Sequence, residues 1–188
     1  MAGRPPEEGP DTAALRHADS LVLIHTGDGK GKTSAAMGMA VRAIARGWRV
    51  LVVQFIKSGA WRAGEHAVLG GLGAEWYVGG DGFSWDSEDL DRSAERAVDA
   101  WNRVREAIRA GEHELVVLDE ITYAINWGWI DGEEVARTIG ERPAHVSIVA
   151  TGRDAPAHLL AVADTVTEMT NVKHAFDAGI AAKRGIDF

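Results

Sequence analysis

The sequence has 188 residues, 46% of them hydrophobic and 26% charged, which is ordinary for a globular protein and excludes a fibrous or wholly disordered chain. Its 28 acidic and 20 basic residues give a formal net charge of −8, which argues against general binding to nucleic acid or an anionic membrane. The absence of cysteine excludes disulfides, thiolate metal sites and a cysteine nucleophile. No apolar run approaches the ~20 residues of a membrane span, and the polar, proline-rich start does not resemble a secretory signal, so we expect a cytoplasmic protein.

Residues 1–19 hold three of the five prolines and several charges, which predicts a flexible N-terminal arm. We expect a single domain over residues 20–188, in which short apolar runs alternate with segments of helical spacing. The expected strands are 20–25, 49–55, 74–78, 114–118 and 146–150; the expected helices are 33–46, 64–72 and about 87–110, with one or two more before the last strand. Apolar strands that alternate with helices indicate an α/β fold with a mainly parallel sheet covered on both faces.

The longest expected helix follows a glycine-rich loop, residues 79–87. Its apolar residues recur at helical spacing, which predicts one buried stripe. We place on this stripe Leu90, Ala94, Ala97, Trp101, Val104 and Ile108. The last segment, 171–188, has no clear period and predicts an extended tail over the surface.

The segment between the first strand and the first helix reads Thr-Gly-Asp-Gly-Lys-Gly-Lys-Thr over residues 26–33. A glycine-rich turn from strand to helix predicts a phosphate-binding loop, because its backbone N–H groups and the helix N-terminus point at an anion. Lys32 can reach the phosphate oxygens, Lys30 supplies a second cation, and the Thr33 hydroxyl can ligate a magnesium or manganese ion held by the nucleotide. The candidate nucleotide-binding residues are Gly27, Asp28, Gly29, Lys30, Gly31, Lys32, Thr33 and Ser34.

The loop departs from the usual phosphate-loop pattern, which has glycine where Thr26 stands. The nearest glycine, Gly27, makes the loop one residue shorter. We therefore expect the triphosphate to lie differently from its position in an ordinary NTPase. The alternative is a glycine-rich turn with incidental lysines, which the coincidence of glycines, lysines and Thr33 in this context disfavours.

Two acids, Asp119 and Glu120, follow the apolar run at 115–118. In a parallel sheet with a phosphate loop, this strand end is where a metal-binding carboxylate is expected. We expect Asp119 to hold the cation directly or through water, and Glu120 to orient water or a neighbouring group. The alternative for Asp119 is a helix cap at an ordinary strand end.

Several segments beyond these motifs resemble the phosphate-loop family of corrinoid adenosyltransferases, which act on cob(I)alamin or cob(I)yrinic acid a,c-diamide. The matching segments are TGDGKGKTSAAMGMAVRA (26–43), VVQFIKSGAWRAGE (52–65), GFSW (82–85), VVLDEITYAINWGWID (116–131), TGRDAP (151–156) and TEMTNVKHAFDAGIAAKRGIDF (167–188). The resemblance implies a single-domain, RecA-like phosphate-loop NTPase fold, usually in a homodimer. It also implies transfer of the 5′-deoxyadenosyl group of ATP to the cobalt of a reduced corrinoid, with release of triphosphate, in adenosylcobalamin biosynthesis or salvage.

The same resemblance assigns roles outside the phosphate loop. It implies that Phe83 and Trp85 crowd the lower face of the corrinoid and displace the axial ligand of cobalt, so that a flavoprotein can reduce the metal. From its place at the end of an expected strand, Arg153 is expected to contact phosphate or adenosine, with a salt bridge to a nearby acid as the alternative. Trp127 and Trp129 either line the flat corrin or fill the core.

Two other functions are weighed against this one. A phosphate-loop ATPase or kinase would release ADP, and we would expect it to carry the full-length loop. A nucleotide-binding module of a RecA-like DNA machine would carry a basic stripe, which the acidic composition disfavours.

Overall fold

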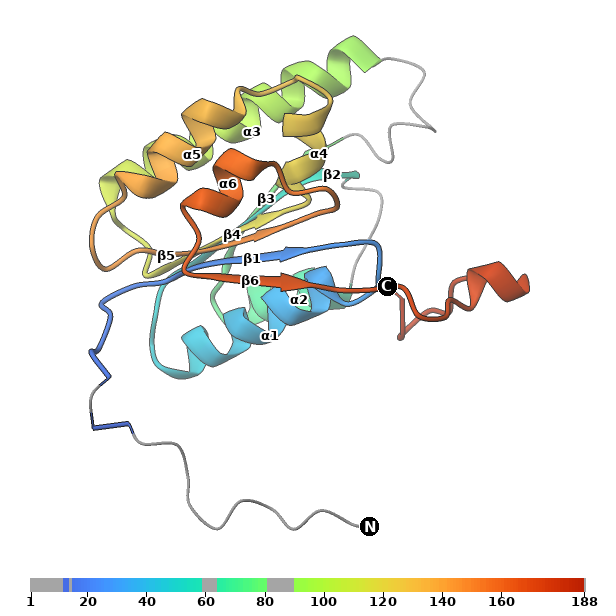
Figure 1. The fold of residues 1–188 in the computed structure, drawn as a ribbon, viewed down its shortest axis with the longest axis horizontal. Coiled ribbons are helices and arrows are strands. Elements are labelled where there is room, and N and C mark those ends of the chain that lie inside the picture. The colour runs from blue at the N-terminus through green and yellow to red at the C-terminus, as the bar shows by residue number, and fades with distance from the viewer. Residues whose placement is uncertain (1–11, 14, 59–63, 81–89, 188) are drawn as a thin grey trace.

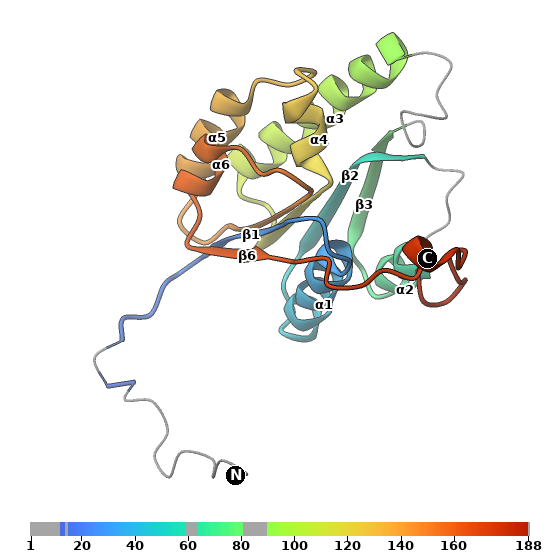
Figure 2. The ribbon, with the colours of Figure 1, turned by 45° about the vertical axis from the view of Figure 1, so that its right-hand side comes forward.

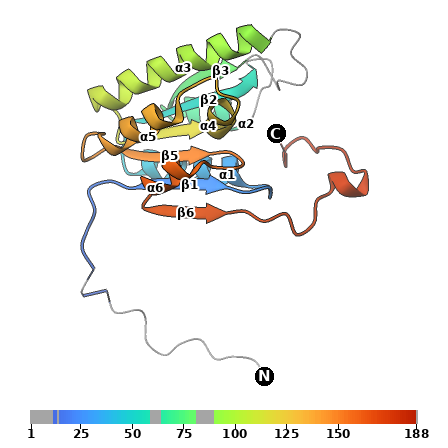
Figure 3. The ribbon, with the colours of Figure 1, turned by 45° about the horizontal axis from the view of Figure 1, so that its top comes forward.

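The computed structural model describes residues 12–187, apart from residues 14, 59–63 and 81–89. Its strands form one parallel sheet with the order β3-β2-β4-β5-β1-β6 (Figures 1 and 3). The strands are β1 (Val22–Thr26), β2 (Val50–Ser58), β3 (Glu75–Gly80), β4 (Leu115–Asp119), β5 (Ser147–Thr151) and β6 (Thr165–Glu168). The helices are α1 (Lys32–Ala45), α2 (Gly64–Gly71), α3 (Leu90–Ala110), α4 (Ile121–Asn126), α5 (Gly132–Gly140) and α6 (Ala157–Ala161), with a 3₁₀ turn η1 (Phe176–Ala178) in the tail.

Helices cover both faces of the sheet, as the sequence predicted. Figure 1 shows α1 and α2 on one face and α3, α4, α5 and α6 on the other. Each face has its own apolar cluster: Ala36 and Ala40 of α1 belong to one, and Trp101 and Val104 of α3 to the other. Every residue of β4 and β5 is buried, because these central strands have a layer of side chains on each side.

The predicted elements are confirmed with shifts of at most three residues at their ends, and two helices, α4 and α5, lie between β4 and β5. The placement of Leu90 on the buried stripe is wrong, since its side chain is 57% exposed. Leu90 is the first residue of α3, and Figure 1 shows this end of the helix extending past the sheet. Among the described residues, no helix is long and apolar enough to cross a lipid bilayer.

The strand order brings the predicted site residues together at the carboxyl ends of the strands, which form one edge of the sheet. Strand β5 lies between β1, which leads into the phosphate loop, and β4, which ends at Asp119. In a parallel sheet all the carboxyl ends lie at the same edge, and ligands bind in the crevice outside them. The residues at 26–33, 119–120 and 151–153 therefore meet although they are far apart in sequence.

Candidate nucleotide-binding site

The phosphate loop packs against the chain that leaves β6. The Met169 N–H donates to the Thr26 carbonyl (2.8 Å), and the Gly29 N–H donates to the Met169 carbonyl (2.6 Å). A Cβ added at Gly27 or Gly29 would lie only 2.6 or 2.7 Å from that carbonyl oxygen. Two of the loop glycines thus permit the close approach of another backbone segment, a role that the sequence alone did not reveal.

The Lys32 side chain folds back onto this loop. Its ammonium donates to the carbonyls of Gly27 (2.5 Å) and Gly29 (2.7 Å). Burial, followed by the nearby Arg153 guanidinium, lowers the pKa of Lys32, and Asp28 and Glu120 oppose that shift. A partly desolvated cation beside a second cation favours the binding of an anion.

Asp119 lies at the centre of a buried hydrogen-bond network at the end of β4, and its side chain is fully buried. The hydroxyl of Thr33 donates to Asp119 Oδ1 (2.8 Å), and the hydroxyl of Thr151 donates to the same oxygen (2.7 Å). The amide of Gln54 donates to Asp119 Oδ2 (3.0 Å). The two residues expected to hold a cation, Thr33 and Asp119, thus lie within hydrogen-bonding distance of each other. The alternative role of Asp119 as a helix cap does not apply, because α4 begins after Glu120.

Glu120 turns the chain from β4 into α4. Its backbone has a left-handed conformation, with φ 64° and ψ 24°, which is uncommon for a residue other than glycine. Its N–H donates to the Thr151 hydroxyl (2.9 Å), so Thr151 bonds both Asp119 and the residue after it. This backbone strain at the edge of the sheet is of the kind that collects at functional sites.

Arg153 faces the phosphate loop from the turn after β5. Its Nε lies 3.6 Å from Asp28 Oδ1, so the ion pair that the sequence left as an alternative is present. The Thr122 hydroxyl donates to the Arg153 carbonyl (2.6 Å), and a Cβ at Gly152 would lie 1.9 Å from that hydroxyl oxygen. Glycine at 152 therefore lets the turn carrying Arg153 pack on α4.

Lys30 and Ser34 face the C-terminal tail and not the Asp119 network. Lys30 forms an ion pair with Asp187, which is strong enough to lower the pKa of that carboxyl group. Ser34 lines a pocket of about 340 Å³ that Gly185 and Ile186 of the tail also line. Figure 2 shows the tail leaving β6, turning through η1 and returning toward α2. The sequence predicted an extended tail but not its return to the loop.

The expected aromatic contacts are only partly within the described chain. Phe83 and Trp85 lie outside the described residues. Trp129 packs against the core, while Trp127 is 39% exposed and contacts the rings of Tyr123 (centroids 5.3 Å apart) and Trp129 (4.8 Å). Burial raises the pKa of Tyr123. These three rings form an aromatic surface on and after α4, next to the turn that carries Arg153.

The donors at the Asp119 network fit a hard divalent cation, because Mg²⁺ prefers hydroxyl, carboxylate and phosphate oxygens. Thr33 and Asp119 supply two such oxygens 2.8 Å apart. Among the described residues, no three His, Asp or Glu side chains converge as a metal site. A cation here would therefore draw most of its ligands from a nucleotide and from water.

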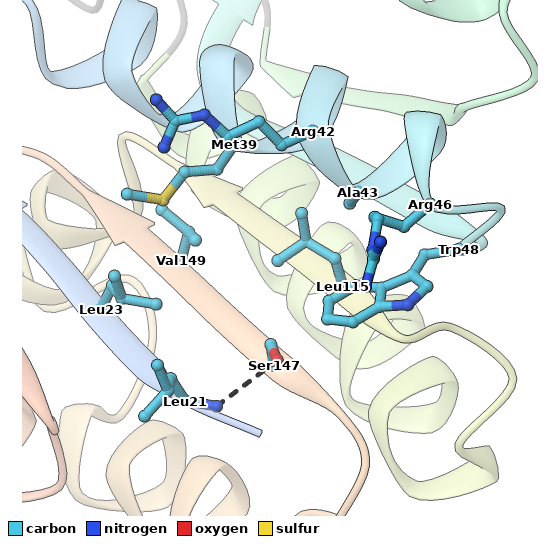
Figure 4. A pocket seen from close by; sticks show the side chains of 10 residues that line it. All are labelled: Leu21, Leu23, Met39, Arg42, Ala43, Arg46, Trp48, Leu115, Ser147 and Val149. Carbon is cyan, nitrogen blue, oxygen red and sulfur yellow. Dashed lines mark hydrogen bonds between the residues drawn. The ribbon is translucent and has the colours of Figure 1, made fainter. Parts of the chain in front are cut away.

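An apolar pocket lies at the amino ends of the strands, at the opposite edge of the sheet from the phosphate loop (Figure 4). It has a volume of about 310 Å³ and is lined by Leu21, Leu23, Met39, Arg42, Ala43, Arg46, Trp48, Leu115, Ser147 and Val149. Figure 4 shows the Leu21 N–H directed at the Ser147 hydroxyl (3.4 Å). Since this pocket holds no carboxylate and no phosphate loop, the candidate site is at the other edge.

The short loop after β1, the acidic end of β4 and the strand between them define a phosphate-loop nucleotide-binding protein of RecA-like topology. A family model described as ATP:corrinoid adenosyltransferase BtuR/CobO/CobP matches residues 18–188. The chain belongs to this family of transferases, as the resemblance predicted.

Individual relatives agree with this assignment. The chain is 40% identical over 168 residues to the corrinoid adenosyltransferase of Escherichia coli K12, covering 89% of this chain and 85% of the relative. It is 42% identical over 178 residues to that of Pseudomonas aeruginosa, covering 94% and 87%. It is 40% identical over 176 residues to corrinoid adenosyltransferase CobA of Salmonella typhimurium, covering 94% and 89%. These likenesses do not favour the ADP-releasing kinase or the DNA machine.

Proposed function

We propose that this protein transfers the 5′-deoxyadenosyl group of ATP to the cobalt of a Co(I) corrinoid and releases triphosphate. The observation that carries the proposal is the short phosphate loop together with its contact to Met169. The loop is one residue shorter than the usual pattern, and the Gly29 N–H bonds the Met169 carbonyl. A shorter loop, one of whose N–H groups is already bonded to Met169, offers fewer donors to a phosphate than the usual loop. This supports a nucleotide pose in which the ribose carbon, and not the terminal phosphorus, is the reacting centre.

The residues around the loop stabilise the leaving group in this proposal. The Co(I) nucleophile forms a bond to C5′ while the bond from C5′ to the triphosphate oxygen breaks, so negative charge grows on the triphosphate. Arg153 lies close enough to Lys32 that its guanidinium helps to lower the pKa of the lysine, and both cations can stabilise that growing charge. Lys30, at the outer side of the loop, adds a third cation. Orientation of C5′ in line with cobalt supplies the remaining rate enhancement.

Magnesium fits the same site. Thr33 would ligate the ion, and Asp119 would hold it directly or through a water molecule. When bound, the ion would neutralise phosphate charge and fix the phosphate geometry. Glu120, within electrostatic reach of Lys32, would orient water beside the phosphates.

The proposal extends to the corrinoid and to the partners. We assign Phe83 and Trp85 to the lower face of the corrinoid. In the sequence they follow β3, whose carboxyl end is on the same side of the sheet as the phosphate loop, and they precede α3. A flavoprotein would supply the electron that produces Co(I), and the chain would act as a homodimer. ATP as a substrate is consistent with the expected cytoplasmic location.

The test is incubation of the protein with ATP, Mg²⁺ and a chemically reduced corrinoid under anaerobic conditions. The proposal expects a light-sensitive adenosylated corrinoid spectrum and one triphosphate for each corrinoid converted. A Lys32→Met variant, which keeps the length of the side chain without its charge, should lose most of the rate. Release of ADP, or no adenosylated product from the unaltered protein, would overturn the proposal.

Trp85→Ala tests the assignment of the aromatic pair. Its rate should fall on the order of tenfold or more when Co(II) and a mild reductant are supplied. It should change far less with pre-formed Co(I), because the side chain acts on the reduction step. Trp101→Phe, a change in the core of α3, is the control for general destabilisation. An equal loss of rate in both assays would contradict the role.

A further inference from the structure

Gln54 is a buried polar residue in a strand of apolar neighbours. Its side chain is 4% exposed, while Val52, Val53 and Phe55 around it are core residues. A buried amide costs free energy unless it is hydrogen-bonded. Gln54 stands directly opposite Asp119 in the parallel pairing of β2 with β4, so the two side chains project from the same face of the sheet.

The amide of Gln54 connects two groups of opposite hydrogen-bonding character. Its Nε2 donates to Asp119 Oδ2 (3.0 Å), and its Oε1 accepts from Trp76 Nε1 (3.3 Å). An ionised carboxylate only accepts and an indole N–H only donates, whereas an amide does both. The two partners therefore fix which end of the Gln54 amide faces Asp119.

Trp76 is itself held in place from two sides. It pairs with Val52 in the register of β3 with β2, so its side chain lies on the face of the sheet that carries Gln54. The ring of His66 from α2 stacks on the indole, with centroids 4.8 Å apart and an interplanar angle of 18°. The indole N–H is thereby directed at Gln54.

We propose that Gln54 and Trp76 are positioning residues that fix the orientation of the Asp119 carboxylate for a divalent cation bound with the nucleotide. With Oδ2 held by Gln54, Oδ1 is directed at the Thr33 hydroxyl (2.8 Å). A neutral amide orients the carboxylate without neutralising it, so the full negative charge remains available to the cation. The inference rests on the proposed function for the identity of the nucleotide and the ion.

The test measures the affinity for ATP by calorimetry, once in Mg²⁺ and once in EDTA. The ratio of the two affinities isolates the contribution of the metal and requires no corrinoid and no turnover. Loss of a residue that orients a metal ligand typically lowers metal affinity about 10–100-fold. Gln54→Leu should therefore reduce the ratio by at least about tenfold, while the affinity in EDTA changes by less than about threefold.

Trp76→Phe is the milder second variant, because it keeps an aromatic ring under His66 and removes the N–H. It should reduce the ratio by about fivefold, the usual effect of one hydrogen bond, and it decides the question if Gln54→Leu does not fold. Tyr77→Phe, the next residue on β3, is the matched control and should leave the ratio unchanged.

A purely structural role for these residues would lower the melting temperature without moving the ratio. The proposal is overturned if Gln54→Leu and Trp76→Phe show the same ratio of ATP affinities in Mg²⁺ and EDTA as the unaltered protein. It is also overturned if the unaltered protein binds ATP equally well with and without Mg²⁺. Failure of the proposed function would give a different result: metal-linked ATP binding would be intact, but no adenosylated corrinoid would form.

Discussion

The buried end of the nucleotide site and its outer rim are held together by different kinds of interaction. At the buried end, Asp119 accepts hydrogen bonds from neutral donors on other elements, and both Asp119 and Thr151 are fully buried. At the rim, Lys30 pairs with Asp187, and Arg153 lies near Asp28. The Lys30 and Arg153 side chains are 56% and 51% exposed.

This difference separates the parts that must stay fixed from those that can exchange partners. Exposed ion pairs contribute little to stability and are screened by salt, so phosphate oxygens can replace Asp187 or Asp28 at small cost. A buried carboxylate that loses a donor keeps its full desolvation penalty. We therefore expect substitutions at the buried end to abolish metal-dependent function and substitutions at the rim to tune it.

Asp119→Asn should have the largest effect. The change removes the buried negative charge that would face the cation, so kcat/KM in Mg²⁺ should fall on the order of 10²-fold or more. Steady-state kinetics across Mg²⁺ concentrations checks this. The control is Asp164→Asn at the other edge of the sheet, where the carboxylate accepts from the Val22 N–H (2.7 Å). A variant at 119 that kept a third of the activity would contradict the importance of the buried end.

Gly29→Ala tests the contact between the phosphate loop and Met169, and it should have an intermediate effect. Its Cβ would lie 2.7 Å from the Met169 carbonyl oxygen, and this backbone atom cannot move without pulling on β6. We expect a loss of about 1–3 kcal/mol in the free energy of unfolding and clearly weaker binding of ATP, measured by denaturation and calorimetry.

Gly38→Ala is the matched control for Gly29→Ala. Position 38 lies in α1 with nothing within 4 Å of the added carbon, so this change should stabilise the protein by about 0.5–1 kcal/mol. If the two variants had the same free energy of unfolding and the same ATP affinity, the loop would not need its close contact with Met169.

Asp187→Asn should have the smallest effect. We expect ATP affinity to change by less than about fivefold, since the pair is at the surface. The Lys30 ammonium lowers the pKa of Asp187, so the stabilisation is present above the ordinary carboxyl pKa. It is lost as the pH falls through the lowered value.

The melting temperatures of the Asp187→Asn variant and the unaltered protein should therefore differ at neutral pH in low salt and converge in acid or in 1 M salt. Asp177→Asn, in η1 of the same tail, is the control. If the difference in melting temperature persisted in high salt, Asp187 would stabilise the protein through interactions that salt does not screen, as the residues of the buried end do.

The central part of the fold could be predicted because its signals are local. Strands β4 and β5 are apolar on both faces, and the phosphate loop is defined by eight consecutive residues. The prediction missed β6, because all four of its residues are exposed and no apolar run marks it. The position of β6 depends on pairing with β1, a contact between distant parts of the chain.

The candidate site, like the fold, could be predicted only where local sequence signals place its residues. Lys32, Thr33 and Asp119 come together as expected, because strand ends in a parallel sheet share one edge. The contacts of Met169 and Asp187 with the loop could not be predicted, since they depend on the path of a tail that lacks periodicity. Gln54 did leave a signal, since a polar residue within the apolar run 50–56 indicates a buried hydrogen-bond partner.

The hydrogen bond between the Gly29 N–H and the Met169 carbonyl provides a built-in reporter. An amide in a loop ordinarily exchanges with deuterated water rapidly, but this one is protected while the residue that follows β6 stays docked. Deuterium uptake at Gly29 therefore measures how often the carboxyl-terminal part of the chain detaches, without any need for substrate or turnover.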